Sequence, residues 1–313
     1  MIRTVLRWGR SDYETDADLA AERDDAAALG LAWRSAPGNA KPDLEQVGAL
    51  VVPSGTRLAR PDLQRFGGNL IVATTSGYDH IDLVAARELG ITVARCPVAR
   101  RDPVAHWCIA AMEALLRKQP AHQAAALEGR WIRDRLPHMA PRSLAGATVA
   151  VVGVGVIGRK TATLLQAFGA QVIGVDPKGV PSDLEARTID DALPDCDAVT
   201  LHCHLDDATA GLLSDDRLRA LPSHAVVVNT SRGHVLALDA AMRLLHDGRL
   251  GGLAVDVYPR EPWRLLAETA SLPGVWATPH AAGFVHDLGQ RVRSEVAAAL
   301  SAWVIGRPIP HVI

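Results

Sequence analysis

The sequence predicts an α/β protein built from two doubly wound parallel-sheet domains. Short apolar runs alternate with longer segments of helical spacing along the 313 residues. Many of these runs are apolar at every position, which is typical of parallel strands covered by helices on both faces. The length favours two domains over one.

Composition excludes several classes of function. The formal net charge is −2, so no overall basic field would attract nucleic acid or an anionic membrane. No run reaches the length of a membrane-spanning helix. The four cysteines form no C-x-x-C pair and show no zinc spacing, so we expect reduced thiols, a cytoplasmic protein and no metal.

The first half of the chain is expected to form one series of strands and helices. Strands are predicted at 1–10, 51–53, 70–74 and 91–94, and helices at 19–29, 61–66 and 83–89. Gly30 and Gly90 stand where a glycine commonly ends a helix. A long helix should follow Pro103, and Pro120 should kink or end it.

A second, more regular series begins at about residue 148. Strands are predicted at 149–152, 172–176, 198–203, 225–230 and 253–256. A helix at 157–168 should end at Gly169, and a last helix is expected at 288–303.

A glycine-rich turn joins the first strand of this series to its helix, and it reads Gly153-Val154-Gly155-Val156-Ile157-Gly158. In such a turn the first glycine permits a tight bend, the second lets a pyrophosphate approach the backbone, and the third allows close packing. Asp176 ends the next strand, where a carboxylate suits the two ribose hydroxyls of NAD and repels the extra phosphate of NADP. A structural turn without a nucleotide is the alternative interpretation.

Three polar residues follow later strands, at the edge where parallel sheets bind ligands: Arg232, Glu261 and His280. A histidine can take or give the proton of a secondary alcohol, and a carboxylate on its far ring nitrogen fixes the tautomer. An arginine can clamp a carboxylate and polarise the neighbouring carbonyl. Taken singly, each could be a surface or turn residue.

With these motifs in order, the chain resembles the D-isomer-specific 2-hydroxyacid dehydrogenases, the group of phosphoglycerate, D-lactate and glyoxylate/hydroxypyruvate dehydrogenases. The resemblance implies NAD-dependent hydride transfer between a D-2-hydroxy acid and its 2-keto acid. His280 would be the acid/base, Glu261 would support it, and Arg232 would bind the substrate. The backbone N–H groups of Ser76 and Gly77 would hold the substrate carboxylate.

The resemblance also implies further cofactor contacts, including one from Asp256 to the nicotinamide carboxamide. The full cofactor set would be Gly153, Gly155, Val156, Ile157, Gly158, Asp176, His202, Thr209, Thr230, Ser231, Asp256 and His280. Residues 1–100 and 284–313 would form a discontinuous substrate domain, and 101–283 the Rossmann-like NAD-binding domain. A hinged cleft would separate the two, and the protein would be a homodimer.

Some residues depart from the family's common pattern. His106, followed by Trp107, stands where an acidic residue is common in the family, and Arg100 and Arg101 stand where it often has a small residue and an asparagine near the cofactor. Arg159 and Lys178 leave some use of NADP open. An alternative function is an NAD(H)-sensing binding protein with little turnover, like the C-terminal-binding corepressors. The residues do not identify the particular 2-hydroxy acid.

Overall fold

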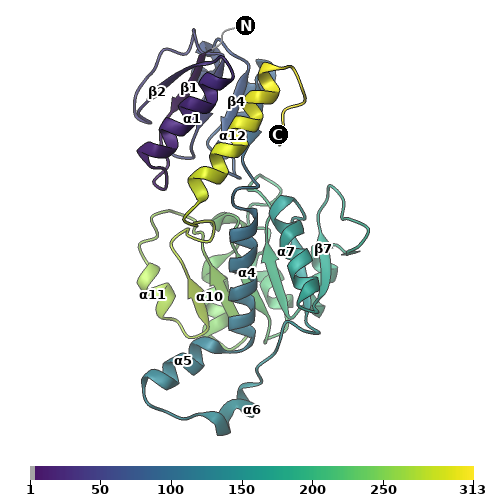
Figure 1. The fold of residues 1–313 in the computed structure, drawn as a ribbon. Helices are drawn as coiled ribbons and strands as arrows, with labels where there is room; N and C mark the ends of the chain where they lie inside the picture. The colour runs from purple at the N-terminus through teal and green to yellow at the C-terminus, as the bar shows by residue number, and fades with distance from the viewer. Residues whose placement is uncertain (1–3) are drawn as a thin grey trace. The chain divides into compact units, whose positions relative to one another are not determined.

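The computed structural model describes residues 4–313, and the chain forms two compact units (Figure 1). Unit 1 comprises Met1–Arg100 and Phe284–Ile313, and unit 2 comprises Arg101–Gly283. Residues 1–3 of the first predicted strand lie outside the described part. Both units contain a parallel sheet with helices on both faces, so the predicted fold class is confirmed.

Unit 1 contains a five-stranded parallel sheet in the order β2-β1-β3-β4-β5. Its strands are β1 (Thr4–Trp8), β2 (Ala32–Ala36), β3 (Ala49–Val52), β4 (Leu70–Ala73) and β5 (Thr92–Arg95). Its helices are α1 (Asp16–Ala28), α2 (Arg60–Arg65), α3 (Leu83–Glu88) and α12 (Leu288–Val304). The glycines at 30 and 90 follow α1 and α3 with positive φ, as the sequence predicts.

Alternation along the strands of unit 1 divides its core into two layers. Val5 and Val51 face α1 and α12, which lie side by side on one face (Figure 1). Leu6 and Leu50 face the opposite way, toward α2 and α3. The last helix of the chain therefore completes the core that the first strand begins.

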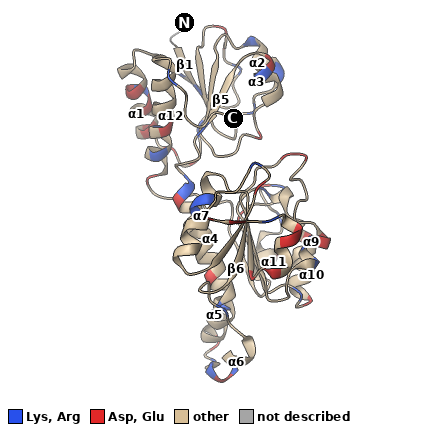
Figure 2. Ribbon diagram, turned by 90° about the vertical axis from the view of Figure 1, so that its right-hand side faces the viewer, with Lys and Arg blue, Asp and Glu red and all other residues tan. Residues whose placement is uncertain are grey.

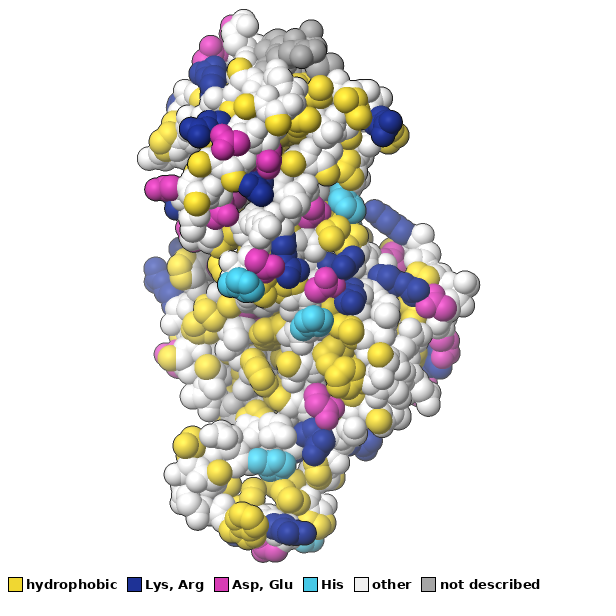
Figure 3. All heavy atoms as spheres, in the orientation of Figure 1, with side chains coloured by type: hydrophobic (Ala, Val, Ile, Leu, Met, Phe, Trp, Pro, Cys, Tyr) yellow, Lys and Arg dark blue, Asp and Glu magenta, His cyan; other side chains and the backbone are white. Residues whose placement is uncertain are grey.

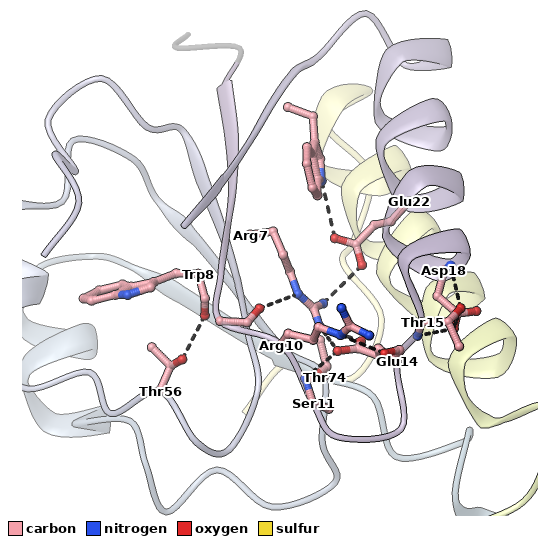
Figure 4. A network of polar contacts seen from close by, with 12 residues as sticks. Arg7, Trp8, Arg10, Ser11, Glu14, Thr15, Asp18, Glu22, Thr56 and Thr74 are labelled. Atoms are coloured by element: carbon pink, nitrogen blue, oxygen red, sulfur yellow. Dashed lines mark hydrogen bonds and ion pairs between the residues drawn. The ribbon is translucent and has the colours of Figure 1, made fainter. Parts of the chain in front are cut away.

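A buried ion cluster lies at the carboxyl end of β1 (Figure 4). The Arg7 guanidinium pairs with Glu14 and, at 3.1 Å, with Glu22, and all three residues are buried. Glu14 also accepts the backbone N–H of Ser11 at 2.7 Å. Two carboxylates share one guanidinium here, and burial raises the pKa of Glu22 despite the opposing charge of Arg7. The cluster ties the 9–14 loop to β1 and α1.

Unit 2 contains a seven-stranded parallel sheet in the order β12-β11-β10-β9-β6-β7-β8. Its strands are β6 (Thr148–Val152), β7 (Gln171–Val175), β8 (Glu185–Ala186), β9 (Ala198–Leu201), β10 (Val226–Asn229), β11 (Gly252–Val255) and β12 (Val275–Ala277). Its helices are α4 (Arg101–Leu116), α5 (Gln119–Leu127), α6 (Leu136–Met139), α7 (Val156–Ala167), α8 (Ile189–Ala192), α9 (Asp215–Ala220), α10 (Leu238–His246) and α11 (Leu266–Ser271). Helices α4 and α7 cover one face, and α8, α9 and α10 cover the other.

An arm projects from the body of unit 2 between α4 and β6 and carries α5 and α6 (Figure 1). Arg142 N–H donates to Leu116 O at 2.9 Å, which closes the base of the arm. The long helix begins before Pro103 and already ends at residue 116, whereas Pro120 stands in the first turn of α5. The expected break near Pro120 is therefore real, but the proline begins the next helix, because its missing N–H costs nothing there.

No helix within residues 4–313 has the length and apolar character that a membrane crossing requires.

Candidate active site

The glycine-rich turn lies between β6 and α7, and two of its glycines are required by close approach. Gly153 has a φ of 90°, and a Cβ built there would lie 2.6 Å from Cys203 N. A Cβ on Gly158 would lie only 1.9 Å from Gly153 O. Gly153 therefore lets the turn pack directly against the backbone that follows β9, and Gly158 lets the first turn of α7 pack against Gly153.

Gly155 differs from its two neighbours, because a Cβ built there would meet no atom within 4 Å. It stands at the N-terminal cap of α7, beside a shallow hollow of about 630 Å³. Arg101, Arg159 and Lys160 line that hollow, and Figure 2 shows basic residues at the start of α7. Arg101 and Lys160 both pair with Asp102, and Arg159 pairs with Asp183. The open backbone at the helix N-terminus is therefore the feature that fits the pyrophosphate of a dinucleotide.

Asp176 lies directly after β7, and its carboxylate is held by backbone N–H groups. Val154 N–H donates to Asp176 Oδ2 at 2.8 Å, and Lys178 N–H donates to Oδ1 at 2.9 Å. These bonds fix the carboxylate against the glycine-rich turn. The role of Asp176 as the acceptor for ribose hydroxyls stays a prediction.

His280 and Glu261 form a hydrogen-bonded pair with 2.7 Å between His280 Nδ1 and Glu261 Oε2. Tyr258 N–H donates to the other carboxylate oxygen, Oε1, at 3.0 Å. Burial acts to raise the pKa of Glu261, but the bond and charge of His280 outweigh it, so this pKa is lowered. The carboxylate stays ionised and holds Nδ1, which leaves His280 Nε2 as the ring nitrogen for other chemistry.

The loop that carries His280 is anchored by Asp256, which is only 2% exposed at the end of β11. Its carboxylate accepts hydrogen bonds from Thr278 Oγ1 at 2.5 Å, Ala281 N at 2.6 Å and Ala282 N at 3.0 Å. Its carbonyl accepts from His280 N at 2.8 Å. His280 itself has a φ of 55°, a left-handed conformation rare for histidine. Asp256 thus positions the histidine, a role that its place in the sequence does not reveal.

Arg232 follows β10 in a turn organised by the fully buried Asn229. Asn229 Nδ2 donates to Arg232 O at 3.0 Å, and its Oδ1 accepts from Ser231 N at 3.0 Å. Arg232 Nη1 donates to Ser231 O at 2.7 Å. The Arg232 charge also helps lower the pKa of Glu261, so the structure brings all three predicted catalytic residues into one group. The sequence gives Asn229 no evident role, yet its amide is what shapes the turn.

Three other predicted cofactor residues lie near the carboxyl ends of β9 and β10. His202 Nε2 and Thr200 Oγ1 are 3.0 Å apart, and burial lowers the pKa of His202 to about 4. Thr209 Oγ1 donates to His204 O at 2.6 Å, and Thr230 Oγ1 lies 3.5 Å from Cys108 Sγ. Their contacts with a cofactor remain predictions. Within residues 4–313, no three His, Cys, Asp or Glu side chains are arranged to hold a metal ion.

The predicted carboxylate-binding loop lies in unit 1, directly after β4. Thr75 Oγ1 donates to Gly77 O at 2.7 Å and bends the loop. Among the described residues, the backbone N–H groups of Ser76 and Gly77 meet no hydrogen-bond acceptor. Two unpaired, neighbouring donors at the carboxyl edge of a parallel sheet suit the two oxygens of a carboxylate.

Comparison with known proteins identifies the class to which this arrangement belongs. The family model of the D-isomer specific 2-hydroxyacid dehydrogenase NAD binding domain matches residues 109–282, more than half of the chain. The chain therefore belongs to the D-isomer specific 2-hydroxyacid dehydrogenase family, and the resemblance seen in its motifs is confirmed. Unit 2 contains the matched NAD-binding domain.

Curated relatives match part of the chain. A D-lactate dehydrogenase from Curvularia clavata is 36% identical over 205 residues, which cover 64% of this chain and 58% of that protein. A 2-hydroxyacid dehydrogenase A from Aspergillus oryzae is 35% identical over 198 residues, covering 62% of this chain and 56% of that protein. The match thus spans less than two thirds of the length of either relative.

Solved structures match nearly the whole chain. The TT0316 protein from Thermus thermophilus has a TM-score of 0.80 and 27% identity, covering 99% of both chains. An acyclic imino acid reductase in complex with NADPH and D-Arg has a TM-score of 0.84 at 19% identity, again covering 99% of both chains. At that identity the second likeness shows the fold alone.

Proposed function

We propose that this protein interconverts a D-2-hydroxy acid and its 2-keto acid, with NAD as the hydride carrier. The observation that supports this most is the His280–Glu261 pair, held at 2.7 Å in a chain whose NAD-binding domain belongs to this family. When bound in its reduced form, the nicotinamide would supply the hydride for reduction of the keto carbon. The remaining steps are derived from the side chains.

His280 Nε2 donates a proton to the developing alkoxide during reduction and takes it back during oxidation. Glu261 holds Nδ1 throughout, which keeps the imidazole in one tautomer and stabilises the protonated ring. Arg232 pairs with the substrate carboxylate and polarises its keto group. In unit 1, the backbone N–H groups of Ser76 and Gly77 are the proposed donors to a substrate carboxylate, which makes unit 1 the proposed substrate-binding unit.

NAD is the proposed cofactor in preference to NADP, because a carboxylate held at the end of β7 would repel the extra phosphate of NADP. Arg159 does not offset it fully, since it already pairs with Asp183 at 2.7 Å. The kcat/KM for NADH should exceed that for NADPH at least tenfold. A preference for NADPH would contradict this role of Asp176.

The experiment that tests the reaction is reduction of a 2-keto acid panel by the purified protein with NADH. The panel should include glyoxylate, hydroxypyruvate, pyruvate and bulkier acids. His280→Ala should lose about 100- to 10,000-fold in kcat because general acid–base catalysis is removed, while NADH binding is retained. His246→Ala is a matched control, because that side chain is 81% exposed. No reduction of any acid, or full activity of His280→Ala, would refute the proposal.

We also propose that the protein is a homodimer in which the arm of unit 2 packs against a second copy. Leu127 is 79% exposed and Trp131 is 86% exposed on this arm, whose apolar side chains are visible in Figure 3. Exposed large apolar side chains on a projecting segment favour burial in an interface. Sedimentation should show a dimer that Trp131→Glu combined with Leu127→Glu weakens, and a monomeric parent protein would contradict this assignment.

A further inference from the structure

Two arginines bind the backbone of the 74–78 loop in unit 1. Arg100 Nη1 donates to Thr74 O at 2.9 Å, and Arg95 Nη1 donates to Ser76 O at 2.8 Å. The two carbonyl groups are two residues apart, which limits their separation to about 7 Å. Both guanidinium groups therefore lie against the short loop whose Ser76 and Gly77 N–H groups are unpaired.

Both guanidinium groups are also held against aromatic rings. The Arg100 guanidinium lies 5.0 Å from the centre of the Tyr13 ring, and that of Arg95 lies 5.6 Å from the Tyr78 ring. Stacking on a ring face leaves the N–H groups at the edge of a guanidinium available for hydrogen bonds. The two side chains are thus restrained in orientation but retain donors.

Neither guanidinium has a carboxylate within 4.0 Å among residues 4–313, although both side chains are only half-exposed. Glu295 interacts with the Arg100 charge beyond ion-pair distance, and its two carboxylate oxygens accept hydrogen bonds from Val98 N at 3.0 Å and Ala99 N at 2.6 Å. Arg7, by contrast, receives two carboxylates in the same unit. Half-buried cations without a counterion favour an anionic partner from solution.

This loop and its two arginines offer more hydrogen-bond donors than one substrate carboxylate can use. The N–H groups of Ser76 and Gly77 match the two oxygens of that carboxylate, so the charges of Arg95 and Arg100 are left for a second anionic group. Phe284 bounds the same surface, since its ring meets the Tyr13 ring edge-on at 5.7 Å and is 53% exposed. An aromatic wall beside a cation fits a short carbon chain that ends in an acidic group.

We propose that the substrate carries a second anionic group at its far end, and that Arg100 and Arg95 select for it. This inference rests on the proposed function, because it assumes that the first carboxylate binds the Ser76 and Gly77 N–H groups. The predicted substrate class is a dicarboxylic 2-keto acid or a 2-keto acid with a terminal phosphate, since a guanidinium binds both groups. Arg100 and Arg95 would be specificity-determining residues.

The test compares substrates of equal shape that differ in charge. Oxaloacetate is paired with 4-methyl-2-oxopentanoate, and 2-oxoglutarate with 5-methyl-2-oxohexanoate, in which an isopropyl group replaces the far carboxylate. The parent enzyme should prefer the diacid by about 10- to 100-fold in kcat/KM, as expected for charge-assisted hydrogen bonds. The kcat/KM of a 2-keto acid with a terminal phosphate ester is then compared with that of the diacids, which shows which anionic group the enzyme prefers. A preference for either anionic substrate over the uncharged analogues supports the proposal.

Substitutions separate recognition from loop structure. In Arg100→Met the preference for the diacid should fall at least tenfold, and Arg95→Met should reduce it in the same direction. Arg100→Lys keeps the charge and should retain part of the preference, whereas Arg87→Met, at an exposed position on α3, serves as the matched control. An equal loss for both members of a pair would show that Arg100 only supports the loop, and would overturn the proposal.

The outcomes also separate this inference from the proposed function. An enzyme that reduces the monoacids as efficiently as the diacids would refute the second-anion proposal and leave the dehydrogenase assignment intact. An enzyme that reduces no 2-keto acid of any charge would refute the dehydrogenase assignment itself.

Discussion

Replacing each glycine of the turn by alanine should separate its structural role from its role in binding the cofactor. The three positions differ in the space available for one added methyl group. Gly155 has no atom within 4 Å of its built Cβ, whereas that distance is 2.6 Å at Gly153 and 1.9 Å at Gly158. Only Gly155 can therefore accept the methyl group without moving the protein.

The expected free energies of unfolding follow from this geometry. Gly155→Ala should change stability by no more than about 1 kcal/mol, because its φ of −74° suits alanine and only a helix-cap preference is altered. Gly158→Ala should cost about 1–3 kcal/mol by overpacking. Gly153→Ala combines overpacking with a φ of 90°, and should cost about 2–5 kcal/mol.

Cofactor affinity should fall in Gly155→Ala even though the stability of that variant is nearly unchanged. If the pyrophosphate approaches the backbone at Gly155, the methyl group of Gly155→Ala occupies its room and weakens NADH binding at least tenfold, or about 1.4 kcal/mol. Urea unfolding gives the stabilities, and titration with NADH followed by fluorescence gives the affinities. A stable Gly155→Ala variant that binds NADH as tightly as the parent protein would refute this account of the turn.

Three further predictions concern the residues that position the loops. Asp256→Asn should lower the free energy of unfolding by about 1–3 kcal/mol in urea titrations, because the amide group cannot accept from all the donors that the carboxylate satisfies. Tyr258→Phe removes the hydrogen bond from the Tyr258 hydroxyl to Thr278 O at 3.0 Å, which should loosen the loop that carries Glu261. The variant should therefore lose more in kcat than in NADH affinity. Equal losses in kcat and NADH affinity would contradict this role of Tyr258. The pKa of Glu22 is raised in the folded protein, so the free energy of unfolding should fall as the pH rises above 4.5, the ordinary pKa of a glutamate. Urea titrations at several pH values should show this dependence in the parent protein and lose it in Glu22→Gln. Arg7→Met should lower the free energy of unfolding by about 3–5 kcal/mol, because it leaves two buried carboxylates without their cation.

Strands that are buried on both faces could be predicted from the sequence. β6, β9, β10 and β11 are short apolar runs, and no surface helix produces that pattern. β2 was not predicted, because Ala32–Ala36 lies at the sheet edge, is largely exposed and shows no apolar alternation. Edge position is a property of the folded sheet and leaves little trace in the local sequence.

The proposed catalytic group of Arg232, Glu261 and His280 could be predicted because its members follow strands that end at one sheet edge. The supports of that group could not be predicted, since they depend on loop conformation. Asn229 and Asp256 act on backbone groups of their own or neighbouring loops, and the distances exist only after the loops have folded. The ion cluster of Arg7 could not be predicted for the same reason, because an arginine within a short apolar run gives no sign of its two carboxylate partners.

The insertion of unit 2 between the two segments of unit 1 also determines the order in which the cores can be completed during synthesis. All residues of unit 2 have been made by residue 283, whereas unit 1 still lacks α12. That helix contributes Val292, Val296 and Trp303 to the buried layer facing β1. The first segment of unit 1 therefore closes its core only after unit 2 has been made, and a ribosome-bound intermediate should protect unit 2 from proteases before unit 1.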